Sequence, residues 1–165
     1  MDVSKAIRYR RSIRKYKDTF IERNDVAEIL EAGRWAPSGL NNQPWKFKVI
    51  TDPKIKEELS TYTKCNEIIK NAPLCICVFL DNSTTYNREK DIMAIGACIQ
   101  NMLLKSVEKG LGSCWLGEIL IKKEEVGNYF KIYPNLELMA VITFGYPDES
   151  AEETDRKPLN ELTLS

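Results

Sequence analysis

The chain has 165 residues, of which 43% are hydrophobic and 29% are charged, with 24 basic and 24 acidic side chains and no histidine. This is the composition of an ordinary soluble domain with one core, and the longest uninterrupted apolar stretch, residues 74–80, is far shorter than the roughly 20 residues that cross a bilayer. These features exclude a membrane-spanning protein; the N-terminus has no long apolar segment, so we expect a cytoplasmic location.

The five cysteines are odd in number and form no C-x-x-C pair, so we expect neither a disulfide framework nor a metal site. Cys75 and Cys77 lie two apart in an apolar run, which predicts that they pack as small hydrophobic groups on one face of a strand. The lack of histidine removes the commonest acid–base group. A bound cofactor is therefore the expected source of any chemistry.

Charge is unevenly distributed along this neutral chain. Residues 1–17 carry seven basic side chains and one acidic side chain, so the remainder is acidic. A basic segment on an acidic body favours a site for a small anion over a nucleic-acid surface, because the acidic body would repel a polyanion.

The first predicted element is a short helix over residues 3–9, which leads into an arginine cluster at residues 10–14. A second helix follows, with Asn24 as its N-cap and Pro37 beyond its end. Prolines bound the turn-rich residues 37–44, which indicates a loop. The next predicted elements are a strand over 45–51 with Trp45 in the core, and helices over 53–61 and 66–71.

Residues 74–80 predict a strand that is apolar on both faces, as in the middle of a covered sheet. A helix of about 20 residues over 91–110 is apolar nearly all round, which indicates burial against a sheet, helices or another subunit. The remaining predicted elements are a short strand over 113–117, a polar helix over 122–130, a last strand over 136–145 and a polar tail. This order predicts a single α+β domain, an α/β sandwich with a central mixed sheet covered by helices.

The arginine cluster is the first candidate site. Arg10, Arg11 and Arg14 surround Ser12 at the end of a helix, and guanidinium groups bind phosphate oxygens two at a time. The same composition is also typical of a solvated basic face or of a nucleic-acid contact. The cluster alone therefore leaves the ligand open.

Four segments together resemble the FMN-dependent nitroreductase family, where FMN is flavin mononucleotide. They are R-R-S-I-R-K-Y at 10–16, A-P-S-G-L-N-N-Q-P-W at 36–45, Q-N-M-L-L at 100–104 leading to G-L-G-S-C-W-L-G at 110–117, and R-K-P at 156–158. The resemblance covers nearly the whole chain. It implies a domain-swapped homodimer with FMN sites at the interface.

The resemblance also implies roles for individual residues. Arg10, Ser12 and Arg14 would hold the FMN phosphate and ribityl chain, with Arg11 beside the ring or the ribityl chain, and Arg156 and Lys157 would close the phosphate site from the tail. The loop of the other subunit would place four residues against the flavin: Pro37, Ser38, Gly39 and Asn41. The alternative explanation of Asn41 and Asn42 is that they only favour the turn, as asparagine commonly does.

The turn at Leu116 and Gly117 would direct backbone N–H groups at the flavin, where they would stabilise charge that develops on hydride transfer. No side chain is then needed as an acid or base. Asn66 is a weak candidate for the flavin pyrimidine contact and is not assigned. The connection over 81–90 is shorter than the segment that covers the flavin in many family members, which leaves the acceptor open.

The function implied is an FMN-dependent NAD(P)H:acceptor oxidoreductase. Hydride would pass from NADH or NADPH through the flavin to a nitroaromatic, a quinone or a similar small molecule in a ping-pong exchange. Alternatives on the same fold are a flavin-modifying or reductive dehalogenating enzyme and a non-catalytic flavin-storage protein. A nucleic-acid binder that uses the basic arm is disfavoured.

Overall fold

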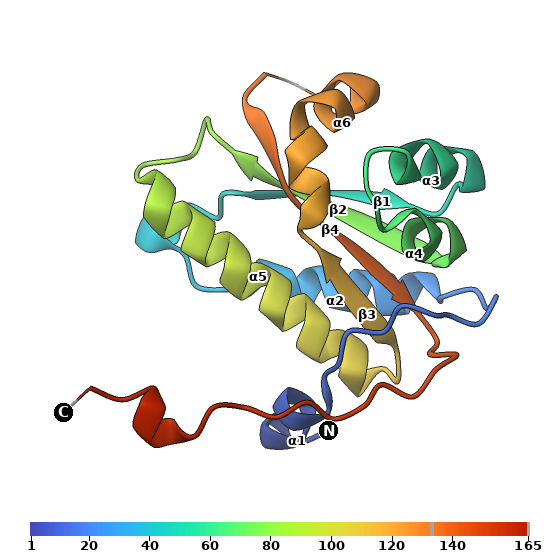
Figure 1. Ribbon diagram of the computed structural model, residues 1–165. Helices are drawn as coiled ribbons and strands as arrows, with labels where there is room; N and C mark the ends of the chain where they lie inside the picture. Colours follow the sequence, from blue (N-terminus) through green and yellow to red (C-terminus); the bar gives the residue numbers. More distant parts are fainter. Residues whose placement is uncertain (133, 165) are drawn as a thin grey trace.

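The computed structural model describes residues 1–132 and 134–164, which form a sheet with helices on both faces (Figure 1). The elements are α1 Val3–Tyr9, α2 Arg23–Arg34, η1 Gly39–Asn41, β1 Trp45–Ile50, α3 Pro53–Ser60, α4 Asn66–Asn71, β2 Leu74–Asp81, α5 Arg88–Glu108, β3 Gly112–Leu116, η2 Glu118–Lys122, α6 Lys123–Phe130, β4 Leu136–Gly145 and η3 Leu159–Glu161. Here η denotes a 3-10 helix. The predicted α+β fold is confirmed.

The four strands lie in the order β1-β2-β4-β3, and each pairs antiparallel with its neighbours. All eight residues of β2 are buried, as its apolar sequence predicted for an inner strand. The expected mixed sheet was wrong for these four strands, because every pair of neighbours runs antiparallel. Among the described residues, parallel pairing is confined to a single bridge between Ser12 and Ser113 outside the four strands.

Two hydrophobic clusters lie on opposite faces of the sheet. On one face, α2 and α5 contribute side chains such as Ile29, Ile99 and Met102. On the other face, α3, α4 and α6 contribute Leu59, Ile69 and Val126, together with the strand residues Cys75 and Cys77. Both of these cysteines are fully buried, as expected. Trp45 is 6% exposed, so its predicted place in the core is also confirmed.

Two helix starts differ from the sequence predictions. Helix α2 begins at Arg23 with Glu22 in the N-cap position, so the assignment of Asn24 as the cap was wrong. The Asn24 amide instead donates to Glu28 Oε1 at 2.9 Å, an i,i+4 pair within the helix. Helix α5 begins at Arg88 because the Asn87 side chain accepts from Lys90 N at 3.1 Å and caps it.

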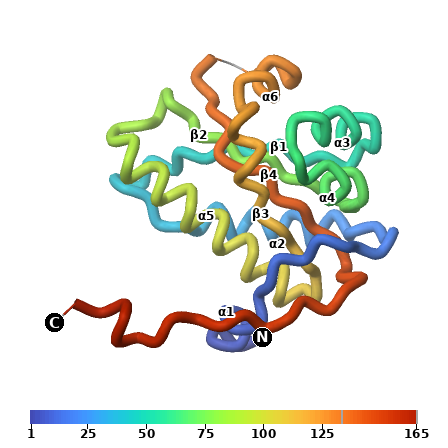
Figure 2. The backbone as a smooth tube through the Cα atoms, viewed as in Figure 1, coloured from blue at the N-terminus to red at the C-terminus, as the bar shows by residue number. Residues whose placement is uncertain are grey.

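The N-terminal helix and the first part of the C-terminal tail lie near each other, beside the C-terminal half of α5 (Figure 2). Helix α1 packs against α5, and the tail passes the same region (Figure 2). The tail then extends beyond α5 and ends in η3, away from the rest of the molecule (Figures 1 and 2).

Candidate functional site

The arginine segment is attached to the edge strand β3. Ser12 forms its bridge with Ser113, and Ile13 N donates to the Ser113 carbonyl oxygen at 2.9 Å. Gly112 allows this close approach, because a Cβ there would lie 2.7 Å from Ile13 Cβ. The backbone of the segment is therefore fixed to the sheet while its arginines remain at the surface.

Tyr16 fastens the other end of the segment. It is 8% exposed, its hydroxyl donates to the Ile13 carbonyl oxygen, and it lies 2.8 Å from Thr143 Oγ1. Burial raises the pKa of Tyr16 far above its ordinary value, so the phenol stays neutral. A Cβ at Gly145 would lie 2.7 Å from the Tyr16 ring, so this glycine makes room for the tyrosine.

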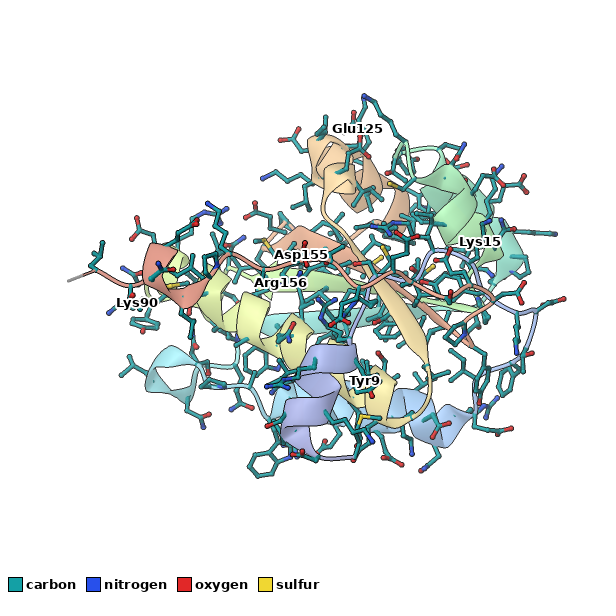
Figure 3. All side chains as sticks on the ribbon, turned by 60° about the horizontal axis from the view of Figure 1, so that its bottom comes forward. Tyr9, Lys15, Lys90, Glu125, Asp155 and Arg156 are labelled. Atoms are coloured by element: carbon teal, nitrogen blue, oxygen red, sulfur yellow. The ribbon has the colours of Figure 1, made fainter. Side chains whose placement is uncertain are left out.

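The arginines open onto a pocket of about 420 Å³. Its lining residues are Arg10, Arg11, Ser12, Arg14, Glu149, Ala151, Glu152, Thr154 and Arg156. Arg156 comes from the tail, which crosses this region close to Tyr9 of α1 (Figure 3). The structure thus brings together five residues that the family resemblance assigned to the FMN site, from segments more than 140 positions apart.

The charges of this pocket are only partly compensated. Arg11 pairs with Glu153 at 3.3 Å. Arg14 contacts the Ser12 carbonyl oxygen at 3.3 Å, and Arg156 contacts Thr154 Oγ1 at 2.8 Å. Within residues 1–132 and 134–164, the side chains of Arg10, Arg14 and Arg156 form no ion pair. The pocket can therefore accept an anion without first breaking a salt bridge at these three arginines.

Glu149 was not predicted. Its Oε1 accepts from the backbone N–H groups of Arg14 and Lys15, at 2.6 and 3.3 Å, and so holds the arginine segment from the tail side. The sequence around it is a polar run with no periodicity, which gave no signal for this role. Lys157, which was predicted beside Arg156, does not line the pocket.

Leu116 and Gly117 lie at the far end of β3 from Ser113. At about 3.3 Å per residue, Gly117 is roughly 13 Å along the chain from the bridge with Ser12. Leu116 is 4% exposed, and a Cβ at Gly117 would meet no atom within 4 Å. The space beside Gly117 is thus open to a ligand that runs along the strand from the arginine pocket.

The loop over 37–43 lies at the opposite end of α5 from the arginines. Leu40, Asn41 and Gln43 have φ angles of 54°, 55° and 47°, and Leu40 is 85% exposed. The loop contacts the first turn of α5, whereas the last turns of that helix lie beside Arg11 and Ile13. With 21 residues, α5 is about 30 Å long, so one chain does not bring Pro37, Ser38, Gly39 and Asn41 to the arginines.

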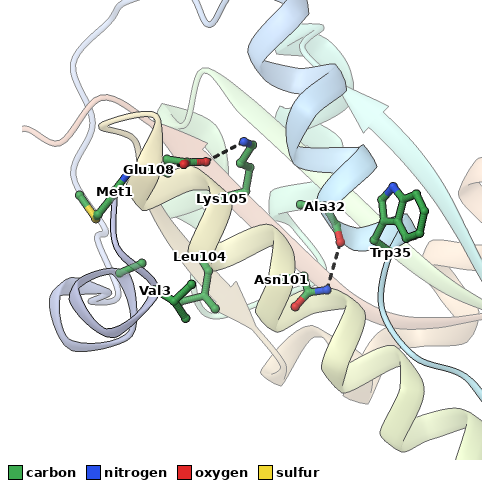
Figure 4. Close-up of a pocket in the computed structure, with 9 residues that line it drawn as sticks. Met1, Val3, Ala32, Trp35, Asn101, Leu104, Lys105 and Glu108 are labelled. Atoms are coloured by element: carbon green, nitrogen blue, oxygen red, sulfur yellow. Dashed lines mark hydrogen bonds and ion pairs between the residues drawn. The ribbon is translucent and has the colours of Figure 1, made fainter.

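A second, largely apolar pocket of about 320 Å³ lies between α1, α2 and α5. Val3 and Leu104 face it, and Trp35 stands at its margin with 73% of its surface exposed (Figure 4). Asn101 donates to the Ala32 carbonyl oxygen at 3.1 Å across its floor. Val3 is 68% exposed as well, so the side chains of Val3 and Trp35 leave an apolar surface at this pocket.

The chain has no histidine, so few of its side chains are of a type that changes charge near neutral pH. Burial raises the pKa values of Cys75 and Cys98 to about 12, and it also raises that of Cys114. In the part of the chain that the structure describes, no three His, Cys, Asp or Glu side chains cluster as metal ligands, and no helix is long and apolar enough to cross a membrane.

Comparison with known proteins shows the family of the chain. The model of the nitroreductase family matches residues 7–66 and 57–146, and the chain belongs to this family. A crystal structure of a protein from Desulfovibrio desulfuricans, described as a nitroreductase in complex with FMN, is 42% identical, covers 100% of this chain and 96% of its own, and superposes with a TM-score of 0.96.

Two relatives show the range of names in the family. A protein from Methanothermobacter thermautotrophicus, described as an NADH dehydrogenase/NAD(P)H nitroreductase, is 31% identical over 94% of this chain and 82% of its own. An iodotyrosine deiodinase from Thermotoga neapolitana is 27% identical over 94% of this chain and 92% of its own.

Proposed function

We propose that the protein is an FMN-dependent oxidoreductase that takes hydride from NADH or NADPH and passes it to a small-molecule acceptor. The observation that carries the proposal is the pocket at the edge of β3, where Arg10, Arg14 and Arg156 lie without an ion pair to any described residue. Such a set of guanidinium groups fits a phosphate dianion. The relatives named above support the choice of FMN and of a nicotinamide donor.

In this proposal each part of the chain has a defined task. Arg10, Ser12 and Arg14 bind the phosphate and ribityl chain, Arg11 lies beside the ring or the ribityl chain, and Arg156 closes the site from the tail. Lys157, which does not line the pocket, has no contact in this proposal. The direction of β3 supports this assignment, because the strand leads from Ser113 to the open space at Gly117. FMN, when bound, supplies the hydride chemistry, and the backbone donors of Leu116 and Gly117 stabilise the negative charge.

The proposed assembly is a homodimer with two shared flavin sites. The length of α5 supports it, because the loop over 37–43 reaches an arginine pocket only if that pocket belongs to another copy. The apolar pocket of Figure 4 and the tail side chains Leu159 and Leu162, which are 78% and 61% exposed, need cover that a second copy would provide. Pro37, Ser38, Gly39 and Asn41 would then contact the partner's flavin.

The proposed turnover is a ping-pong exchange, in which the nicotinamide leaves before the acceptor enters the same site. The acceptor class is a nitroaromatic, a quinone or a similar molecule. Reductive dehalogenation is the second candidate, and the similarity to an iodotyrosine deiodinase favours it. We place the activity in the cytoplasm, in keeping with its need for reduced nicotinamide.

The purified protein provides the test. It should be yellow, and anaerobic addition of NADH or NADPH should bleach the flavin absorption. A yellow protein that neither donor bleaches would instead be a flavin-storage protein, and a colourless protein that does not take up FMN would contradict the proposal. Turnover with a nitroaromatic, a quinone and a halotyrosine then distinguishes the acceptor classes.

The assembly is tested separately by sedimentation. An obligate interface of roughly 2,000 Å² or more should give a dimer at all accessible concentrations. A stable, flavin-loaded monomer would contradict both the dimer and the shared site.

A further inference from the structure

We infer that Asp91 is a positioning residue, which acts through Asn42 to hold the loop over 37–43 in the shape that it presents to the flavin. The inference rests on the proposed function, since that function brings the loop to the partner's cofactor. Its physical basis lies within one chain.

Asp91 is fully buried in the first turn of α5, on the side of the loop. Its Oδ1 accepts from Asn42 Nδ2 at 2.7 Å, and its Oδ2 accepts from the backbone N–H groups of Tyr86 and Asn87 at 3.2 and 3.3 Å. A carboxylate is retained at such depth only where donors replace its water. The two oxygens of Asp91 therefore tie the 37–43 loop to the segment that precedes α5.

Asn42 completes this connection. Its Nδ2 also donates to the Thr84 carbonyl oxygen at 3.1 Å, so both amide protons are directed at the same segment. Its Oδ1 is buried and has no hydrogen-bond partner among the described residues. An unsatisfied buried acceptor reduces stability. The two hydrogen bonds that Asn42 Nδ2 donates must therefore offset the cost of leaving Oδ1 without a partner.

The loop needs such support because its backbone is strained. Leu40, Asn41 and Gln43 all adopt left-handed backbone angles, which residues other than glycine seldom populate. Strained backbone persists where surrounding contacts over-determine it, and it gathers at functional sites. The Asn42 side chain lies in the middle of this strained run.

Tyr86 supports the loop from the same segment. A Cβ at Gly39 would lie 1.7 Å from the Tyr86 hydroxyl oxygen, so the tyrosine fills the space under that glycine. Asp91 fixes the backbone N–H of this same tyrosine. The buried carboxylate of Asp91 thus contacts both the Asn42 side chain and the backbone of Tyr86, whose ring packs against Gly39.

The test exchanges the two partners. Asn42→Asp places a second carboxylate against Asp91 and should free the loop. The double variant, which combines Asn42→Asp with Asp91→Asn, restores an amide opposite a carboxylate with their places exchanged. The amide introduced at position 91 accepts from the backbone through its oxygen and donates through its nitrogen to the carboxylate introduced at position 42. Asn24→Asp is the matched control, because Asn24 also donates to a carboxylate, Glu28, but on the exposed surface of α2.

Hydrogen exchange on the flavin-free protein reports the loop directly. We expect amides of residues 38–43 to exchange at least tenfold faster in Asn42→Asp and to be unchanged in Asn24→Asp. In the double variant they should return part of the way toward the parent, because the pair with position 91 is restored while the bond to the Thr84 carbonyl oxygen stays lost. If Asn42→Asp does not fold, Asn42→Ala replaces it, because alanine removes the amide without adding a charge. Exchange that is unchanged in the folded variant would overturn the inference.

FMN titration then links the loop to the flavin. The Kd for FMN should rise about tenfold in Asn42→Asp, and the absorption bands of the bound flavin should shift toward those of free FMN, with both effects partly reversed in the double variant. Faster loop exchange with unaltered affinity and spectrum would overturn the positioning role and leave the proposed function standing. Parent protein that binds no FMN would overturn the proposed function and the positioning role together.

Discussion

Arg14 illustrates how one residue can be tested at the proposed phosphate site. Its guanidinium contacts the Ser12 carbonyl oxygen at 3.3 Å and forms no ion pair with a described residue, so its charge is available to a ligand. Arg14→Ala should weaken FMN binding by about 1.5–3 kcal/mol, the range for hydrogen bonds to charged groups, which is roughly a ten- to 150-fold rise in Kd. Fluorescence titration measures this, with the exposed Arg23→Ala as control. Unchanged affinity in the Arg14 variant would remove this arginine from the site.

At the scale of elements, the contact between the arginine segment and β3 depends on a missing side chain. A Cβ at Gly112 would lie 2.7 Å from Ile13 Cβ, so Gly112→Ala should push the segment off the strand. We expect a loss of about 1–3 kcal/mol in the free energy of unfolding, as for overpacked cores, together with weaker FMN binding. Gly127→Ala is the control, because its Cβ would meet Ile132 at an ordinary 3.5 Å. Equal stability of the two variants in urea would show that the segment is free to move.

The packing of α2 on α5 carries an electrostatic component that acid should remove. Glu28 accepts from Lys109 at 2.7 Å and pairs with Lys105 at 3.1 Å, and these lysines lower the pKa of Glu28 below 4.5. A carboxyl whose folded pKa is depressed stabilises the fold above its unfolded pKa and loses that contribution as the pH falls through the folded value. Chemical unfolding should therefore give a constant free energy between about pH 6 and 8 and a decline below about pH 4.5. Glu28→Gln should reduce the decline, whereas the exposed Glu57→Gln should not.

The sequence predicted those elements whose pattern is local. Periodicity and turn residues located the helix at Asn66–Asn71 and the strand at Leu136–Gly145 to the residue. The arginine motif indicated four side chains that line one pocket, and the R-K-P segment indicated a fifth, Arg156. Asn24 was misassigned as a cap because its side chain could bond either to the backbone at the helix start or to Glu28 one turn later. The sequence alone does not decide between these two partners. Glu149 and Asp91 act through contacts 135 and 49 positions away, and no spacing rule encodes such contacts.

At the scale of the whole molecule, the candidate site is incomplete in one chain. The arginine pocket and the strained loop lie at opposite ends of α5, and the apolar pocket between α1, α2 and α5 is open at the surface. In a homodimer, one interface would bring the loop of one copy to the arginine pocket of the other and would also cover the apolar pocket. In the proposed dimer the walls of the acceptor site come from two copies, and no spacing within one sequence encodes contacts between copies.

The same whole-molecule arrangement predicts a reaction without a titrating side chain. The chain has no histidine, burial raises the pKa of Cys114, and the pKa of Tyr16 is raised by burial as well. Cys114 lies on β3 two residues before Leu116 and is 3% exposed, so it is a packing group beside the proposed backbone donors. Flavin reduction by saturating NADH or NADPH should then change little between about pH 6 and 8, where an ordinary histidine would titrate. Cys114→Ala should keep the rate within a few-fold, and stopped-flow absorbance of the flavin measures both. Either a steep dependence on one proton or complete loss of reduction in a folded, flavin-loaded Cys114→Ala variant would show that a side chain takes part in the chemistry.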